Sequence, residues 1–190
     1  MSPSEVLRRI TAALDRAGIA YMLTGSFASA HYGAPRSTQD IDVVIAPSPA
    51  QLRAFLQSLP SVEYYSDLDA ALEAHKRESL FNVIHLATGW KIDLIIRKSR
   101  AFSLEEFDRR HLVTVRSLPL FVARAEDVVI AKLEWSKLAQ SQRQLEDVAT
   151  ILRLQWEALG RSYLERWICE LDLKQEWSHA KRIAGISEST

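Results

Sequence analysis

Apolar and polar positions follow two different periods along this 190-residue chain, and the change of period divides it into two parts. Up to residue 124, short apolar runs rich in β-branched residues alternate with stripes at helical spacing, which predicts strands between helices. From residue 125 onward the spacing is helical throughout. We therefore predict an α/β domain at residues 1–124, followed by a helical subdomain at residues 125–190, with a cleft between them where ligands often bind.

The individual elements follow from the same pattern and from its breaks at glycine and proline. The strands are predicted at residues 19–24, 39–46, 79–88 and 90–98, with a strand pair or a bent extension at 111–117 and 118–123. The helices are predicted at residues 2–18, 26–32, 48–59, 66–78, 103–110, 125–139, 143–156 and 161–173. Ser66 with Asp69, and Ser103 with Glu106, match the capping-box pattern and predict helix starts at Ser66 and Ser103.

Two acids interrupt the apolar strand predicted at residues 39–46. Asp40 and Asp42 are two residues apart, so they face one side of the strand while Ile41 and Val43 face the core. At a rise of about 3.3 Å per residue, the two side chains start roughly 6–7 Å apart. Two ionised carboxylates at this distance repel each other unless they reach solvent or share a cation, and Mg²⁺ prefers such oxygens.

A third acid, Asp93, lies between apolar residues in the strand predicted at residues 90–98. If that strand lies beside residues 39–46, Asp93 joins Asp40 and Asp42. Three carboxylates at one place predict a two-metal site that activates an attacking oxygen and stabilises a leaving pyrophosphate.

Gly25 and Ser26 stand where a predicted strand turns into a predicted helix. Glycine permits a tight turn, and the backbone N–H groups at a helix start suit a phosphate, to which the Ser26 hydroxyl can also donate. Each feature alone has a simpler explanation: a capped turn for Gly25-Ser26, and solvated acids on a strand face for the aspartates. Their order and spacing together favour a nucleotide site.

Composition limits the remaining function classes. Lys plus Arg equals Asp plus Glu at 24 each, so no overall positive field favours nucleic acid, although a local basic groove stays open. The single cysteine, Cys169, and the lack of a long apolar run are typical of a cytoplasmic protein without a membrane segment. The sequence contains neither zinc-ligand spacing nor a Walker-type glycine loop.

The motif of Gly25-Ser26, a spacer, Asp40-Ile41-Asp42-Val43 and later Asp93 resembles the DNA polymerase β-type nucleotidyltransferase superfamily. The stretch that contains Arg36, Thr38 and the two strand acids is similar to minimal nucleotidyltransferases and to AbiEii-type toxins of type IV toxin–antitoxin systems. In the helical part, Lys132, Arg143 and Asp147 resemble a later AbiEii-like element, with looser spacing. Thr24 departs from the family by standing where an apolar residue usually precedes the glycine.

The resemblance implies a nucleotidyltransferase fold, with a mixed β-sheet flanked by helices, and transfer of a nucleoside monophosphate from a nucleoside triphosphate to a hydroxyl acceptor. Mg²⁺ or Mn²⁺ would be the cofactor, held by the three aspartates, with Asp93 also a possible general base. The implied roles of the other residues concern phosphate and nucleotide binding: Gly25, Ser26, Arg36, Thr38 and Asp147. Lys132 would be a catalytic residue that pairs with a phosphate or with Asp147 across the cleft.

The resemblance leaves several possibilities open. The acceptor is a tRNA end, a protein hydroxyl or a small molecule such as an aminoglycoside, and an antitoxin partner or a homodimer is possible. Lys132 could instead be a solvated helix lysine, and Arg36 an ordinary loop arginine. The alternative functions are a nucleotide-binding module without turnover and an interaction protein. The interaction protein would bind through tryptophans of its C-terminal helices: Trp135, Trp156, Trp167 and Trp177.

Overall fold

The computed structural model describes residues 2–35, 38–115 and 117–186. The described chain divides into two compact units, one formed by residues 2–26 and 38–123 and the other by residues 27–35 and 124–186. The second unit therefore combines the C-terminal helices with a short segment from the N-terminal part. The division into domains at residues 1–124 and 125–190 stays a prediction.

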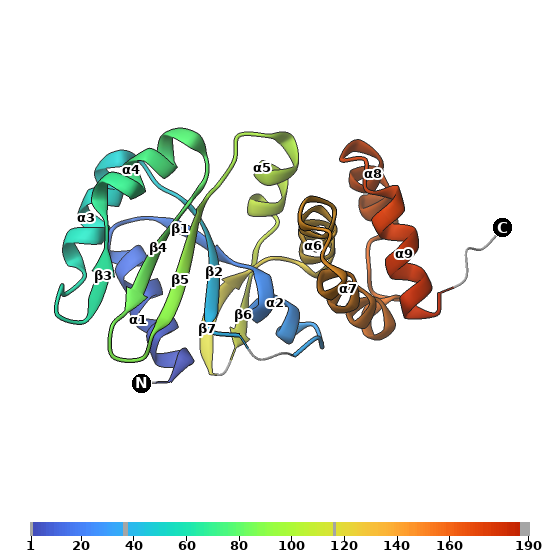
Figure 1. Cartoon of the computed structure of the whole chain (residues 1–190), viewed down its shortest axis with the longest axis horizontal. Helices are drawn as coiled ribbons and strands as arrows, with labels where there is room; N and C mark the ends of the chain where they lie inside the picture. Colours follow the sequence, from blue (N-terminus) through green and yellow to red (C-terminus); the bar gives the residue numbers. More distant parts are fainter. Residues whose placement is uncertain (1, 36–37, 116, 187–190) are drawn as a thin grey trace. The chain divides into compact units, whose positions relative to one another are not determined.

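Within the described residues, seven strands form one mixed sheet in the first unit, in the order β3-β4-β5-β2-β1-β7-β6 (Figure 1). The strands are β1 (Ala20–Leu23), β2 (Asp40–Ala46), β3 (Tyr64–Ser66), β4 (Leu80–His85), β5 (Trp90–Ile96), β6 (His111–Val115) and β7 (Leu118–Val122). β2 and β5 run parallel at the centre, whereas β1 and β4 flank them in antiparallel pairs. This confirms the predicted fold class, a mixed sheet flanked by helices.

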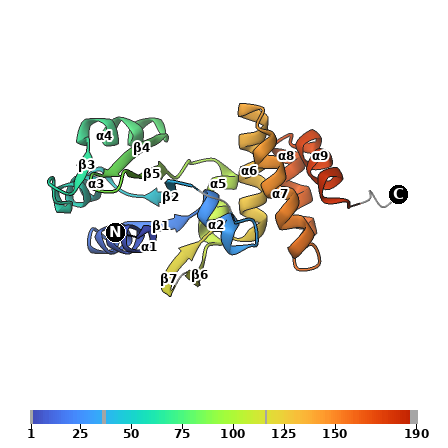
Figure 2. The same cartoon turned by 60° about the horizontal axis from the view of Figure 1, so that its bottom comes forward.

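The hydrophobic pattern of the sequence predicted the strands at one edge of the sheet but missed the strand at the other edge. β6 and β7 form an antiparallel hairpin at one edge, which confirms the strand-pair interpretation (Figure 2). β3, at the other edge, was predicted as loop and helix start. Its three residues pair with β4, and a run this short has too little period to show in the sequence.

The apolar side of the central strands forms the core of the first unit. Ile41, Val43 and Ile45 of β2 are fully buried, as are Ile92 and Leu94 of β5. Three helices make a connected layer with the sheet, since α1 contacts β1 and α3, and α4 contacts α3 and β4. These helices are α1 (Pro3–Arg16), α3 (Pro49–Ser58) and α4 (Leu68–Arg77). Because side chains alternate along a strand, the acids of β2 and β5 lie on the opposite face from this core.

Two predicted helix starts are wrong. The cap of α4 is Asp67, whose side chain accepts the Ala70 N–H at 2.9 Å, while Ser66 ends β3. The helix α5 (Ala101–Asp108) begins before Ser103, which is buried and accepts from Arg100 Nε at 3.0 Å. In both cases a serine three residues before an acid matched the capping pattern, but local packing placed the helix start elsewhere.

The second unit is helical. Its helices are α6 (Ala125–Ala139), α7 (Gln142–Gln155), α8 (Arg161–Glu170) and α9 (Lys174–Ala184), together with most of α2 (Gly25–His31). α7 contacts both α6 and α9, and α6 also contacts α8 (Figure 2). The helix α9 was not predicted. Among the described residues, no helix has both the length and the apolar character that a bilayer span requires.

Candidate functional site

The three predicted acids come together on one face of the first unit's sheet. β2 and β5 pair in parallel with Asp42 opposite Asp93, and Asp40 lies two residues before Asp42. Directly paired residues on neighbouring strands point to the same face, and so do residues two apart. The expectation that Asp93 lies beside the other two aspartates is therefore confirmed.

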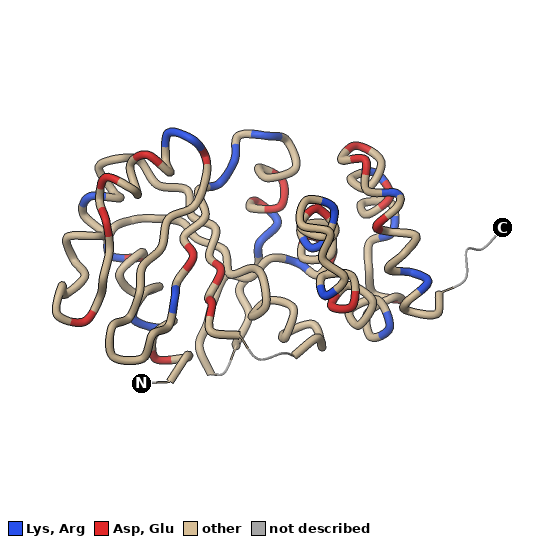
Figure 3. The backbone as a smooth tube through the Cα atoms, in the orientation of Figure 1, with Lys and Arg blue, Asp and Glu red and all other residues tan. Residues whose placement is uncertain are grey.

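A lysine that the sequence reasoning missed lies inside this group. Lys91 pairs with Asp40 across the two strands, and its Nζ lies 3.3 Å from Asp40 Oδ1 and 3.2 Å from Asp93 Oδ2. Burial lowers the pKa of Lys91, but its hydrogen bonds to Asp93 and Asp40 outweigh this and hold that pKa above its ordinary value. The ammonium group therefore stays charged. Figure 3 shows that acidic and basic positions lie close together along β2 and β5.

Asn82 completes the surroundings of Asp93. It lies opposite Asp93 on the neighbouring strand β4, and its Nδ2 donates to Asp93 Oδ1. Asp93 thus accepts from Asn82 through one oxygen and contacts Lys91 through the other. The sequence signal for Lys91 was its position two residues before Asp93. Asn82 could have been found only from the register of the predicted hairpin.

Gly25 contacts the same group from the turn between β1 and α2. Its φ is +59°, and a Cβ atom at this position would lie 1.9 Å from Asp42 Oδ2 and 2.5 Å from Asp42 Cγ. The Thr24 N–H donates to the Asp42 backbone carbonyl at 3.0 Å, which holds the turn against β2. The Asp42 carboxylate therefore lies directly against the turn, and only glycine leaves room for it. Ser26, the next residue, is 4% exposed.

Thr38 shapes the entry to β2. Its Oγ1 accepts the Asp40 N–H at 3.1 Å and lies 3.3 Å from the Asp40 carbonyl oxygen. Through these contacts Thr38 holds the backbone at Asp40 in place. Arg36, the other residue predicted in this loop, lies outside the described residues.

The donor set suits a divalent cation. It consists of carboxylates from adjacent strands, which are the ligands that Mg²⁺ and Mn²⁺ prefer, and it already attracts one positive charge in Lys91. As the side chains stand, no group of three or more His, Cys, Asp or Glu within residues 2–35, 38–115 and 117–186 is arranged to hold a metal ion. Asp40, Asp42 and Asp93 would have to move locally to hold an ion, and their role as metal ligands stays a prediction from the sequence.

Lys132 and Asp147 lie together in the second unit. Lys132 Nζ on α6 lies 2.7 Å from Asp147 Oδ2 on α7 and 2.9 Å from Gln144 Oε1, and Lys132 is only 4% exposed. The interpretation of Lys132 as a solvated lysine is therefore wrong, whereas the pairing with Asp147 is present. It joins two neighbouring helices of the same unit, so the expectation that the pair lies across a cleft is wrong.

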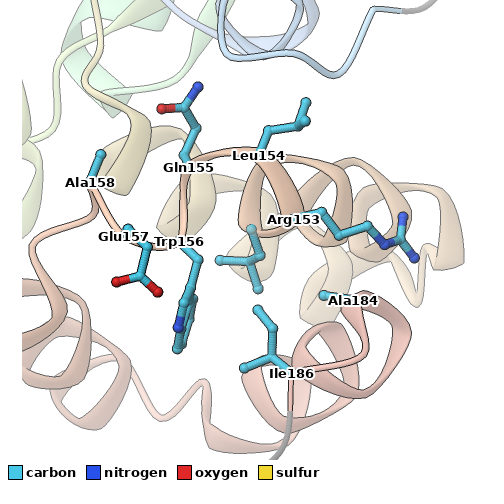
Figure 4. A pocket seen from close by; sticks show the side chains of 9 residues that line it. Arg153, Leu154, Gln155, Trp156, Glu157, Ala158, Ala184 and Ile186 are labelled. Carbon is cyan, nitrogen blue, oxygen red and sulfur yellow. The ribbon is translucent and has the colours of Figure 1, made fainter.

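The second unit also contains a shallow pocket of about 460 Å³, between the C-terminal parts of α7 and α9 (Figure 4). Its lining includes Arg153, Trp156, Glu157 and Ile186, and none of the residues predicted to be catalytic or to bind metal or nucleotide. The Trp156 ring stacks on Trp177 with centroids 6.2 Å apart. Two of the four tryptophans considered for partner binding thus pack against each other.

No protein-family model matches the chain, and no curated protein sequence matches it either. Solved structures do resemble it. The solution structure of the antibiotic-resistance factor ANT(2″)-Ia aligns over 92% of this chain and 95% of that one, with 14% identity and a TM-score of 0.53. The crystal structure of ANT(2″)-Ia in complex with adenylyl-2″-tobramycin aligns over 91% and 97%, with 12% identity and a TM-score of 0.54.

A third similar structure is an antigenic nucleotidyltransferase-like protein from Paracoccidioides brasiliensis. It aligns over 90% of this chain and 89% of its own, with 16% identity and a TM-score of 0.51. At these identities the likeness concerns the fold. The chain has the nucleotidyltransferase fold, as its sequence motif implied.

Proposed function

We propose that this protein is a metal-dependent nucleotidyltransferase that moves a nucleoside monophosphate from a nucleoside triphosphate to a hydroxyl acceptor. The observation that carries the proposal is the register of β2 and β5, which brings Asp42 opposite Asp93 with Asp40 on the same face. The proposal is further supported by the fold, which is shared with nucleotidyltransferases.

Each residue of the group has a role in this proposal. Asp40 and Asp42 hold Mg²⁺ or Mn²⁺ together with the triphosphate, and Asp93 helps to hold them and accepts the proton of the acceptor hydroxyl. Gly25 keeps the turn close to Asp42, and Ser26 donates to a phosphate oxygen. Arg36, Thr38, Lys132 and Asp147 remain proposed nucleotide contacts on the sequence motif alone. When bound, the ions supply positive charge for the phosphoryl oxygens and the leaving pyrophosphate.

A small-molecule hydroxyl is the acceptor that we favour. The similar protein ANT(2″)-Ia is an antibiotic-resistance factor with a structure in complex with adenylyl-2″-tobramycin, an adenylylated small molecule. The balanced charge of this chain fits such an acceptor better than a long nucleic acid. A tRNA end, a protein hydroxyl, an AbiEii-like toxin role with an antitoxin partner, a homodimer and a cytoplasmic location all stay predictions from the sequence.

The test of the activity is label transfer from α-labelled nucleoside triphosphates to cell extract and to aminoglycosides, with Mg²⁺. Asp42→Asn should reduce transfer at least about 100-fold, because losing one metal ligand weakens stabilisation worth several kcal/mol. Asp69→Asn makes the same chemical change on the exposed surface of α4 and should leave transfer intact. Full transfer by the Asp42 variant contradicts the proposal.

One observation favours a second candidate, a module that binds nucleotide without turnover. Both oxygens of Asp93 contact side chains of this chain, Asn82 and Lys91, which leaves the carboxylate less available as a base. Calorimetry with several triphosphates, run beside a pyrophosphate-release assay, separates the two functions. Tight binding without release supports the module, and the absence of any binding eliminates both functions.

A further inference from the structure

We propose that Lys91 is a built-in counter-ion of the acid group, which holds Asp40 and Asp93 together in the metal-free protein and is displaced when a divalent cation binds. This inference rests on the proposed function, because it concerns the same three acids. It adds a residue and an exchange step that the motif does not contain.

The geometry places Lys91 where a metal would bind. Its Nζ contacts Asp40 Oδ1 at 3.3 Å and Asp93 Oδ2 at 3.2 Å, so it bridges carboxylates that belong to two different strands. Three ionised carboxylates on adjacent positions of one sheet face repel each other, and Lys91 places a full positive charge in contact with two of them. One ammonium group among them lowers the formal charge of the group from −3 to −2, and one divalent cation in its place lowers that charge to −1.

Lysine and metal compete for the same oxygen atoms. Mg²⁺ binds carboxylate oxygens at about 2.0–2.1 Å, so an ion on Asp40 Oδ1 or Asp93 Oδ2 would lie no more than roughly 5–6 Å from Nζ as it stands. The metal ion and the lysine ammonium group repel each other at this distance, and both need the same carboxylate oxygens as ligands or acceptors. Binding of the metal therefore favours a conformation in which Lys91 has turned away.

Lys91 is suited to such an exchange, unlike the other paired lysine described above. Its two contacts are longer than the approximately 2.7–2.9 Å of strong charge-assisted bonds, and its side chain is 39% exposed. The flexible stem of a lysine can then move the ammonium group into water at little cost. Lys132, by contrast, contacts Asp147 at 2.7 Å with its side chain 5% exposed, which describes a fixed pair.

The first measurement is Mn²⁺ binding by calorimetry, comparing the wild type with Lys91→Met. Removing the competitor should tighten Mn²⁺ binding about tenfold or more. Lys98→Met removes the same charge from an exposed position after β5, outside the acid group, and should change the dissociation constant less than about twofold. Equal affinities of wild type and Lys91→Met overturn the inference.

The second measurement follows Lys91 itself in the wild-type protein, and the variant serves only to assign the signal. Reductive ¹³C-methylation leaves the charge on lysines and gives each one an NMR signal, and the signal missing in Lys91→Met belongs to Lys91. Titration with Mg²⁺ should move this signal to the chemical shift of exposed lysines. Half of the shift should occur at the Mg²⁺ concentration at which half of the protein has bound metal. A Lys91 signal that stays in place while metal binds overturns the inference alone. Failure of the wild type to bind Mn²⁺, alone or with a non-hydrolysable triphosphate, overturns the proposed function as well.

Discussion

At the scale of single residues, the site depends on a glycine as much as on its acids. Gly25 combines a left-handed backbone, which disfavours a side chain, with contact to the Asp42 carboxylate, which leaves no room for one. Sequence reasoning assigned Gly25 to a turn near phosphate. The structure adds that its missing side chain makes room for the aspartate, which links the turn to the acid group.

Gly25→Ala should therefore lose both stability and metal binding. A Cβ atom 1.9 Å from Asp42 Oδ2 must displace that side chain, in addition to the cost of roughly 1–2 kcal/mol for a non-glycine residue at positive φ. Urea unfolding and Mn²⁺ calorimetry measure the two effects.

Gly89→Ala is the matched control for this substitution. Gly89 has a φ of +69°, and nothing lies within 4 Å of its added Cβ. It should therefore show the backbone cost alone, with metal binding unchanged. If both variants bind Mn²⁺ like the wild type, the close contact between Gly25 and Asp42 has no role in the site.

At the scale of elements, the strands carry the acids and the helices of the second unit carry a buried ion pair. The pair between Lys132 and Asp147 joins α6 to α7 and excludes water almost completely. Such a pair stabilises little overall, but removing one partner leaves an uncompensated buried charge. The question at this scale is whether Lys132 holds two helices together or also contacts nucleotide.

Lys132→Met should destabilise the protein by about 3–5 kcal/mol, because Asp147 would keep a buried charge without the ammonium group that contacts it. The double variant Lys132→Met/Asp147→Leu removes both charges and should recover most of the loss, as measured by urea unfolding. Label transfer then separates the roles. A stable double variant with full activity excludes a direct role for Lys132, and a stable but inactive one supports the nucleotide contact.

At the scale of the whole molecule, the chain is shared between two units in an unexpected way. Residues 27–35 belong to the unit that the C-terminal helices form. Gly33 illustrates the connection, since a Cβ atom there would lie 2.3 Å from Leu154 Cδ1 on α7. A fragment cut at residue 124 would therefore lose contacts that the segment 27–35 makes in the intact chain.

Ligand binding should be visible in the stability of the intact protein. A complex of metal and a non-hydrolysable triphosphate that binds as one ligand, at 100 times its dissociation constant, stabilises the folded state by about 2.7 kcal/mol, which raises Tm by roughly 5–10 °C for a chain of this size. Differential scanning calorimetry with and without EDTA measures this shift. Asp42→Asn should show no shift, and an equal shift in that variant would place the binding elsewhere.

The sequence by itself determined the type of most elements and the common face of Asp40 and Asp42. Both follow from local period, since neighbours in the chain decide which side of a strand a residue occupies. The sequence also indicated the fold through its motif, because Gly25-Ser26 marks a turn and the three acids mark two strands. These features need no knowledge of distant contacts.

Only the tertiary structure decided which segments meet. The parallel register that places Asp93 opposite Asp42, the contact of Lys91 with two acids and the bond from Asn82 all join different strands. The burial of Lys132 and the placement of residues 27–35 likewise depend on helices far along the chain. The physical reason is that pairing and burial are set by the packing of the whole chain, whereas periodicity is set by adjacent residues.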